Sequence, residues 1–270
     1  MRIIEDYNMY MEEIGIVKEK EHYTNCYFLK NKVLQLIEHR KLYYEKQGDN
    51  VILYEKEEGF YRLYYWISDI GSVNEIKNNI PVVIEFPYCK ELSQKNKIEL
   101  ELISKLGFEL GRESSQMVMK KEEVIWKDEL LDDKVRFDYP NIDDFKRIKE
   151  LLFVSFNTLF AFLPTDEQLK SLINNHNIIV AYFDEEIVGV LNTEQVNNTV
   201  WIRHMCIDKK HQGKNFGSSL HNEGCKRWIN KAKEFRCWVD IHNISSVKMY
   251  QRQGYYFTDK KANEYVKYSQ

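Results

Sequence analysis

The 270-residue sequence has few cysteines and few prolines, and neither residue type forms a recognisable motif. Its five cysteines are an odd number, and no two of them stand in a CxxC pair. This pattern excludes a disulfide-framed secreted domain and a zinc site built on paired cysteines. The four prolines do not gather in a Pro-, Gly- or Ser-rich linker that would divide the chain. We therefore expect reduced thiols, no bound metal and a cytoplasmic location.

A strong charge of one sign and long apolar runs are also missing. The formal net charge is −3 at pH 7, which gives no reason to expect nucleic acid or an anionic membrane as a partner. No apolar run approaches the ~20 residues of a membrane span, and the start, "MRIIEDYNMYMEEIG", has no signal-peptide core. The chain does contain 43% hydrophobic and 14% aromatic residues, enough for packed cores. We expect a soluble monomer or homodimer.

The best domain boundary is the charged stretch "KKEEVIWKDELLDDK", Lys120 to Lys134, which separates two segments of similar size. We predict domains at residues 1–125 and 134–270. In the second, the strand-like segments are "KVRFDY", "NIIVAYF", "EEIVGVLNTEQV", "TVWIRHMCI" and "FRCWVDI". Segments with helical spacing stand between them, and "GYYFTDKKANEYVKY" is interpreted as a closing hairpin. This alternation predicts a mixed α/β fold.

The two segments end in a similar way, at Gly107 and Gly254. Each glycine stops a helix-like segment, is followed by an aromatic residue, and leads into an amphipathic strand. We interpret this as a weak internal repeat, which favours two copies of one fold. Because helix–glycine–strand junctions are common in α/β proteins, a coincidental similarity stays open as the alternative.

The stretch "HQGKNFGSSL", His211 to Leu220, follows the strand-like "TVWIRHMCI" and precedes a helical segment. It is not a Walker loop, because it lacks the first glycine and the hydroxyl after GK, and GxGxxG occurs nowhere in the chain. One interpretation is a plain turn with Asn215 as a helix cap. The other is an anion-binding loop, in which backbone N–H groups at a helix start receive a phosphate.

The order of strand, "QGKNFG" and helix resembles the acyl-CoA signature of the GNAT superfamily of N-acetyltransferases. That signature is Gln or Arg, two residues, Gly, one residue, then Gly or Ala, so Gln212 and Gly217 match its ends. Asn215 replaces the middle glycine, and because asparagine tolerates positive φ we expect the loop to keep its shape. Downstream, "DIHNISSVKMYQRQGYY" supplies the family's asparagine and tyrosine as Asn243 and Tyr250. The resemblance covers residues 134–268.

The resemblance implies a GNAT fold, a mixed and mostly antiparallel twisted sheet flanked by helices, in two tandem GNAT-like domains. It also implies an acyltransferase that moves an acetyl group from acetyl-CoA to a primary amine of a small molecule, an amino acid or a peptide. The first domain lacks the loop and carries Ile103 at the place of Tyr250, so we expect it to be a degenerate copy. The residues expected to bind the co-substrate are Met205, Cys206, Ile207, Gln212, Gly213, Lys214, Asn215, Phe216, Gly217, Ser218 and Asn243.

The chemistry of acetyl transfer needs an acid and a base. The departing thiolate needs a proton, and the resemblance assigns Tyr250 as the general acid. Glu194 and His204 are the two candidate bases, with a chain of waters as a third alternative. Strand alternation counted from Ile207 places Arg203 on the expected face and His204 on the other, unless a β-bulge re-aims it. We expect Arg203 to bind a substrate carboxylate through its planar fork of donors.

Three other functions stay open at this stage. The donor can be a different acyl-CoA. The chain can be a tandem-domain aminoacyl transferase of the peptidoglycan type, although the near-neutral charge and the acyl-CoA signature argue against binding of charged transfer RNA. It can also be a non-catalytic acyl-CoA sensor, if Asn215 and the lack of a clear base have removed turnover.

Overall fold

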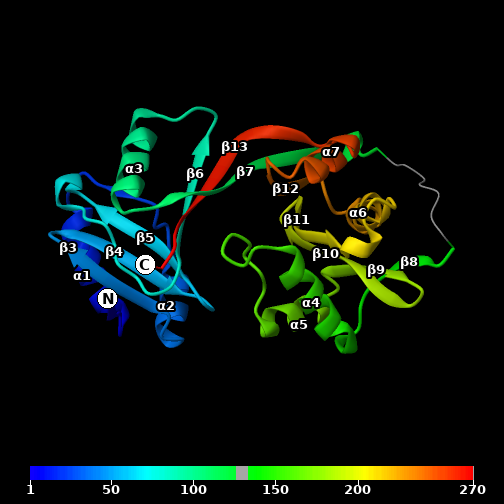
Figure 1. Ribbon diagram of the computed structural model, residues 1–270, viewed down its shortest axis with the longest axis horizontal. Coiled ribbons are helices and arrows are strands. Elements are labelled where there is room, and N and C mark those ends of the chain that lie inside the picture. Colours follow the sequence, from blue (N-terminus) through cyan, green and yellow to red (C-terminus); the bar gives the residue numbers. More distant parts are fainter. Residues whose placement is uncertain (126–132, 270) are drawn as a thin grey trace. The chain divides into compact units, whose positions relative to one another are not determined.

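The computed structural model of the protein describes residues 1–125 and 133–269 (Figure 1). The chain divides into two compact units, Met1–Glu113 with Lys260–Gln270, and Ser114–Asp259. The boundary stretch indicated by the sequence, residues 120–134, falls within the second unit, and its residues 126–132 lie outside the described ones. In the described part of the chain, every helix is too short or too polar to cross a membrane.

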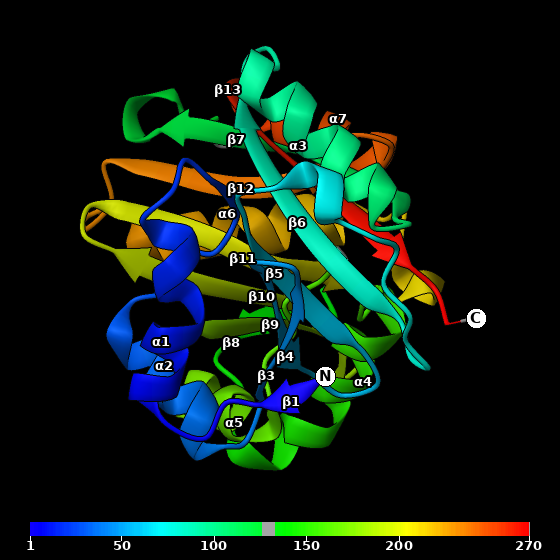
Figure 2. The ribbon, with the colours of Figure 1, turned by 90° about the vertical axis from the view of Figure 1, so that its left-hand side faces the viewer.

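The first unit is a mixed sheet with helices on both faces, and Figure 2 turns it toward the viewer. Across the sheet the strands are β1 (Arg2–Ile3), β3 (Leu42–Gln47), β4 (Asn50–Lys56), β5 (Tyr61–Ile67), β6 (Val82–Cys89) and the end of β13 (Tyr256–Lys267), with β2 (Tyr23–Thr24) beside β5. Only β5 and β6 pair in parallel among these described strands. The helices are α1 (Tyr7–Lys18), α2 (Lys30–Glu38) and α3 (Gln94–Lys105), with a short 3₁₀ helix at Ile70–Ser72.

Alternation along β4 explains why this sheet is covered on both sides. Val51 and Leu53 pack in the core under α1 and α2, whereas Ile52 and Tyr54 pack in the core under α3. Successive side chains of a strand point to opposite faces, so a strand that is apolar throughout needs a cover on each face.

The second unit has the mixed, mostly antiparallel sheet that the sequence predicts. Its strand order is β7 (Glu109–Lys120), β12 (Glu234–Asp240), β11 (Thr199–Ile207), β10 (Glu186–Val196), β9 (Ile178–Phe183) and β8 (Val135–Asp138). Only β11 and β12 pair in parallel among them. α4 (Phe145–Ser155) and α5 (Asp166–Asn174) cover one face, and α6 (Phe216–Trp228) and α7 (Ile244–Arg252) cover the other.

Local sequence signals set the ends of several of these elements. Thr165 and Gln168 form a capping box at the start of α5. Asp184 and Glu185, at the hairpin turn between β9 and β10, both have positive φ, as the turn of a tight hairpin requires. Asn141 caps a 3₁₀ turn that leads into α4. These parts of the fold follow from residues close in sequence.

The predicted closing hairpin is wrong. Residues Tyr256–Lys267 form one long strand, β13, whose segment Lys260–Lys267 pairs with Cys89–Val82 of β6. Its partner is therefore distant in sequence, and local turn signals do not reveal such a partner. Similarly, β7 pairs through Ser114–Lys120 with β12. Each of these strands follows the glycine that ends a helix, at Gly107 and at Gly254, where φ is +88 and +102.

Two glycines with positive φ offer a matched stability test. A Cβ on Gly254 would lie 2.5 Å from the backbone oxygen of Glu123, whereas a Cβ on Gly213, where φ is +78, would meet nothing within 4 Å. Gly213→Ala should lower the free energy of unfolding by only about 1–2 kcal/mol, the cost of the left-handed conformation for a residue with a Cβ. Gly254→Ala adds a clash with the backbone oxygen of Glu123. We therefore expect its free energy of unfolding to fall by about 2–5 kcal/mol in all. Urea unfolding of the full chain measures both, and equal losses would contradict the prediction.

Candidate functional site

The parallel pair β11–β12 opens at its C-terminal end. The described strands pair only where Thr199–Ile202 lies beside Glu234–Cys237, although both strands continue beyond that point. On its other side β11 stays paired with β10 as far as Ile207. At residues 203–207, the edge of β11 that faces away from β10 is therefore not paired with β12. This open edge includes Met205, Cys206 and Ile207, three of the residues expected to bind the co-substrate.

A β-bulge at Arg203 marks the point where the strands separate. Asn192 of β10 lies opposite His204 and Thr193 lies opposite Ile202, so Arg203 is the extra residue. Before the bulge, Val200 and Ile202 pack in the core under α6; after it, the alternate residues Met205 and Ile207 do so. The alternation counted back from Ile207 is therefore wrong beyond the bulge, and Arg203 does not share the face of Ile207.

The loop after β11 has the backbone shape that the sequence predicts. Gly213 and Asn215 both adopt positive φ, +78 and +64, so asparagine takes the left-handed conformation in place of glycine. Gln212 donates from Nε2 to the carbonyl oxygen of Ile207 at 2.9 Å, which ties the loop to the end of β11. Residues Gln212–Asn215 are exposed, and Lys214 extends over the ring of Phe183.

The loop leads directly into α6. The first helical bond runs from the N–H of Ser219 to the oxygen of Asn215, at 3.1 Å. The amides of Phe216, Gly217 and Ser218 precede it and have no partner within the helix. In the described structure the side chain of Asn215 makes no capping bond to them. These amides and the positive end of the helix dipole suit a phosphate group.

The start of α6, the end of β11 and α7 lie together. A Cβ on Gly217 would be 3.7 Å from Cγ1 of Ile207 and 3.8 Å from Sδ of Met249 on α7. Gln253, the C-cap residue of α7, donates from Nε2 to the oxygen of Ser218 at 3.4 Å. The predicted phosphate loop and the helix that carries Tyr250 are thus neighbours.

Tyr250 is almost fully buried in α7, and its ring packs in the core shared with α6 and β12. Burial, with smaller contributions from Cys237 and Cys225, raises the pKa of Tyr250 well above its usual value. The hydroxyl therefore stays protonated at neutral pH, as a proton donor must. Ile103, at the equivalent place in the first unit, is buried in the core under α3.

The two candidate bases lie in different environments. Glu194 accepts from Nε of Arg203 at 2.6 Å, and both side chains are exposed. Arg203 also lies over the ring of Trp201, 5.1 Å from its centre. His204 points to the α4 face of β11, where its ring contacts Phe156 edge-on, and it is nearly buried.

Three of the expected co-substrate residues use their side chains elsewhere. The side chain of Asn243 caps α7 by accepting from the N–H of Ser246 at 3.1 Å. Phe216 is buried in the core. The thiol of Cys206 is buried beneath α4, which raises its pKa to about 11. For Phe216 and Cys206, only the backbone is left to contact a ligand at the open edge.

A buried polar cluster that was not predicted from the sequence packs against Tyr250. His221 of α6 is fully buried, and its Nε2 lies 3.0 Å from the hydroxyl of Tyr255. Tyr255 is the aromatic residue that follows Gly254, and Cys225 lies one turn along α6 from His221. The only sequence signal was a histidine beside an apolar helical stripe, which does not indicate a hydrogen-bonded partner.

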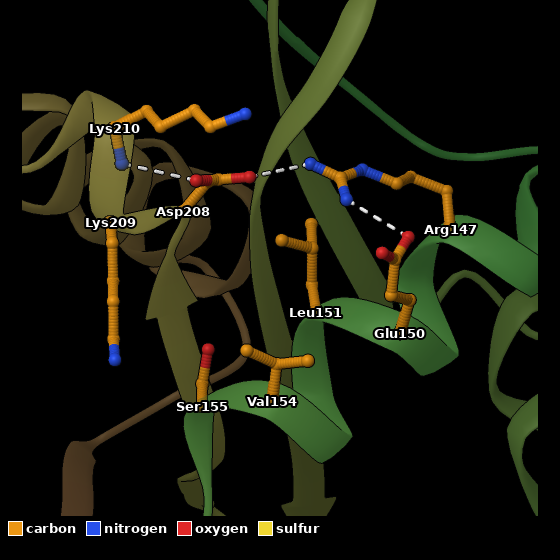
Figure 3. A pocket seen from close by; sticks show the side chains of 8 residues that line it. All are labelled: Arg147, Glu150, Leu151, Val154, Ser155, Asp208, Lys209 and Lys210. Atoms are coloured by element: carbon orange, nitrogen blue, oxygen red, sulfur yellow. Dashed lines mark hydrogen bonds and ion pairs between the residues drawn. The ribbon is translucent and has the colours of Figure 1, made fainter.

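A pocket on the α4 face of β11 is lined by charged side chains, of which Arg147, Glu150 and Asp208 are paired with one another (Figure 3). Asp208 accepts from Nη2 of Arg147 at 2.7 Å and from the N–H of Lys210 at 3.1 Å, and Arg147 donates to Glu150. These bonds hold the pKa of Asp208 below its usual value. The cluster fixes the turn that leads from β11 into the loop.

The first unit has a similar parallel pair, but its open edge is covered. β5 and β6 pair only at Tyr61–Val82 and Arg62–Val83. Beyond that point, Asn25 donates to the oxygen of Leu63 at 3.2 Å and accepts from the N–H of Tyr65 at 2.8 Å. Thr24 donates to the oxygen of Tyr65 at 2.7 Å, and β2 continues the pairing. The chain's own segment therefore bonds the backbone groups that are open in β11.

No cluster of three or more His, Cys, Asp or Glu side chains suited to a metal ion occurs among the described residues. The candidate site consists of the open edge of β11, the start of α6 and the buried phenol of Tyr250.

Residues 145–255 match the model of the Acetyltransferase (GNAT) family. The chain is also similar to a solved GCN5-related N-acetyltransferase from Sphaerobacter thermophilus, at 11% identity over 87% of this chain and 85% of that chain, with a TM-score of 0.57. A second, from Kribbella flavida, is 9% identical over 89% of this chain and 96% of that chain, with a TM-score of 0.52. These likenesses show the fold. No curated protein matches the sequence.

Proposed function

We propose that this chain, an acyltransferase whose residues 145–255 form a domain of the GNAT acetyltransferase family, transfers an acetyl group from acetyl-CoA to a primary amine. The single observation that carries the choice of donor is the open edge of β11, which leads into a loop followed by helix-start amides that have no partner within α6. An acyl-CoA is a long amide-containing chain with a diphosphate at its far end. Its two parts therefore match the strand edge and the helix start.

Donor binding is assigned to backbone groups with a few side chains. The amides of α6 and the ammonium of Lys214 receive the phosphates. Met205, Cys206 and Ile207 lie on the edge of β11 along which β12 forms no ladder, and we assign this edge to the amides of pantetheine. Gly213 and Asn215 supply the two left-handed turns that aim the amides outward. We expect Gln212 to act by fixing the loop, because its side chain is bonded to Ile207.

The transfer step needs stabilisation of an oxyanion and protonation of the thiolate. Backbone N–H groups on the open edge of β11 suit the oxyanion that develops on the thioester carbonyl. Tyr250 donates its phenolic proton to the departing sulfur. The phenol is the weaker acid, with a reference pKa of ~10 against ~8.5 for a thiol, so this transfer needs the thiolate held close to the hydroxyl.

We assign binding of the acceptor amine to the β-bulge at Arg203. Glu194 and Arg203 form an exposed ion pair there, and we propose that the pair binds the acceptor, with Arg203 directed to a substrate carboxylate. Glu194 and His204 remain the two residues proposed to take the proton of the amine. Glu194 has the better access, because His204 is nearly buried on the α4 face.

The experiment is a thiol-release assay on the full-length protein with acetyl-CoA and a panel of amines, combined with native mass spectrometry. We expect one acetyl-CoA per chain, because the corresponding edge of β5 is covered by residues 23–25. We also expect an acetylated amine in at least one reaction. Two bound molecules per chain would contradict the assignment to the second unit.

The same assay separates the alternatives. Binding without turnover on any amine would favour an acyl-CoA sensor. If turnover occurs only with a longer acyl-CoA, that thioester is the donor and acetyl-CoA is not. Failure to bind any acyl-CoA would remove the proposal.

A further inference from the structure

Three aromatic rings pack edge-on against one another in the core of the second unit. The ring centres of Tyr250 and Tyr255 are 5.1 Å apart, those of His221 and Tyr255 are 5.4 Å apart, and those of His221 and Tyr250 are 5.8 Å apart. The planes are inclined by 63° to 82°, so each ring presents an edge to a neighbour's face. The ring of Tyr250 therefore contacts the rings of both His221 and Tyr255, and we call these three residues the aromatic triad.

A hydrogen bond connects the other two members. The hydroxyl of Tyr255 lies 3.0 Å from Nε2 of His221, and both residues are buried. Burial lowers the pKa of His221 to about 4, so the imidazole is neutral at working pH. Its contribution is therefore a directed bond and not a charge.

Tyr255 is also coupled to Tyr250 through the backbone. The N–H of Tyr255 donates to the oxygen of Tyr250 at 3.1 Å, across the turn in which Gly254 ends α7. Tyr255 thus contacts Tyr250 through both its ring and its main chain. Because His221 lies in the middle of α6, its bond to Tyr255 anchors the end of α7 on α6.

We propose that His221 is a positioning residue, which acts through Tyr255 to fix the orientation of the Tyr250 ring and its hydroxyl. This rests on the proposed function, in which Tyr250 is the proton donor. A phenol that protonates a thiolate must keep its hydroxyl aligned with the sulfur, because small misplacements of a reacting group lower rates strongly.

Two substitutions remove the bond from opposite sides. His221→Leu keeps an apolar side chain in the core, and Tyr255→Phe keeps the ring and removes only the hydroxyl. Each is expected to lower kcat about tenfold, with the KM for acetyl-CoA nearly unchanged. Because both break one bond, the double variant should be no slower than either single variant. His221→Gln, which can place an amide near the position of Nε2, should restore much of kcat.

A second readout does not depend on activity. Ring signals of ¹³C-labelled tyrosine in the full-length protein, with Tyr250 assigned by its loss in Tyr250→Phe, report its orientation and ring motion. We expect His221→Leu and Tyr255→Phe to shift or broaden the Tyr250 signals in the same way, and His221→Gln to return them toward those of the wild type. This distinguishes the two proposals, since an inactive wild type would end the proposed function and leave the ring test in place.

Two results would overturn the positioning role. One is that Tyr250 signals and kcat stay as in the wild type when either partner is replaced. The other is that kcat effects of the single variants multiply in the double variant, which would mean that His221 and Tyr255 act independently.

Discussion

Tyr250→Phe is expected to lower the turnover number about 10²–10⁴-fold, the usual contribution of a general acid. The substitution keeps the ring in its contacts with His221 and Tyr255 and removes only the hydroxyl. Affinity for acetyl-CoA should stay nearly constant, because the assigned donor contacts lie on β11 and the loop. Steady-state kinetics with the best amine, and calorimetric titration with acetyl-CoA, measure the two quantities.

Tyr256→Phe is the matched control. It also removes one phenolic hydroxyl, but Tyr256 is exposed on β13, so its turnover should equal that of the wild type. Full turnover in Tyr250→Phe would show that solvent or another residue protonates the thiolate. The role assigned to α7 would then have to be withdrawn.

Ser218→Asp is expected to weaken acetyl-CoA binding about 10- to 100-fold, because a fixed carboxylate replaces a donor where phosphate is to bind. Ser218 is the third residue of α6, one of the three whose amides precede the first helical bond. A negative charge in the first turn of a helix stabilises it by about 0.3–1 kcal/mol. The variant should therefore unfold no more easily than the wild type while binding its ligand less well.

Ser218→Asn is the neutral counterpart, close to Asp in size and shape. Calorimetry should show near wild-type affinity for it, and thermal unfolding should show no gain in stability. If the two variants bound acetyl-CoA equally well, the start of α6 would not be the phosphate site.

Features encoded by neighbouring residues were predictable from the sequence. The loop shape is one, because the tolerance of asparagine for positive φ predicts the conformation found at Asn215. The junctions at Gly107 and Gly254 are another: both glycines follow a helix, have positive φ and lead into a strand. The alternation of strands and helices in the second unit followed from the same local patterns, whereas its mixed, mostly antiparallel sheet was implied by the resemblance to the GNAT family.

Features that depend on pairing between distant residues were not predictable. A single extra residue at Arg203 reverses which side chains of β11 face α6, and no property of "TVWIRHMCI" marks that position. The partner of β13 is β6, far from it in sequence, so the end of the chain was misjudged as a hairpin. His221 was overlooked for the same reason, since its role depends on Tyr255, which lies on another element.

The pairing of β6 with β13 also affects the order in which the two units can fold during synthesis. During synthesis, domains generally fold in the order in which they leave the ribosome. Here the unit that begins at Met1 also needs residues 260–267 to complete its sheet, whereas Ser114–Asp259 is one uninterrupted segment. The later-made unit can therefore finish folding while the earlier one still has an unpaired strand at its edge. The sheet that contains β1 and β3 is therefore completed only after residues 260–267 have been translated.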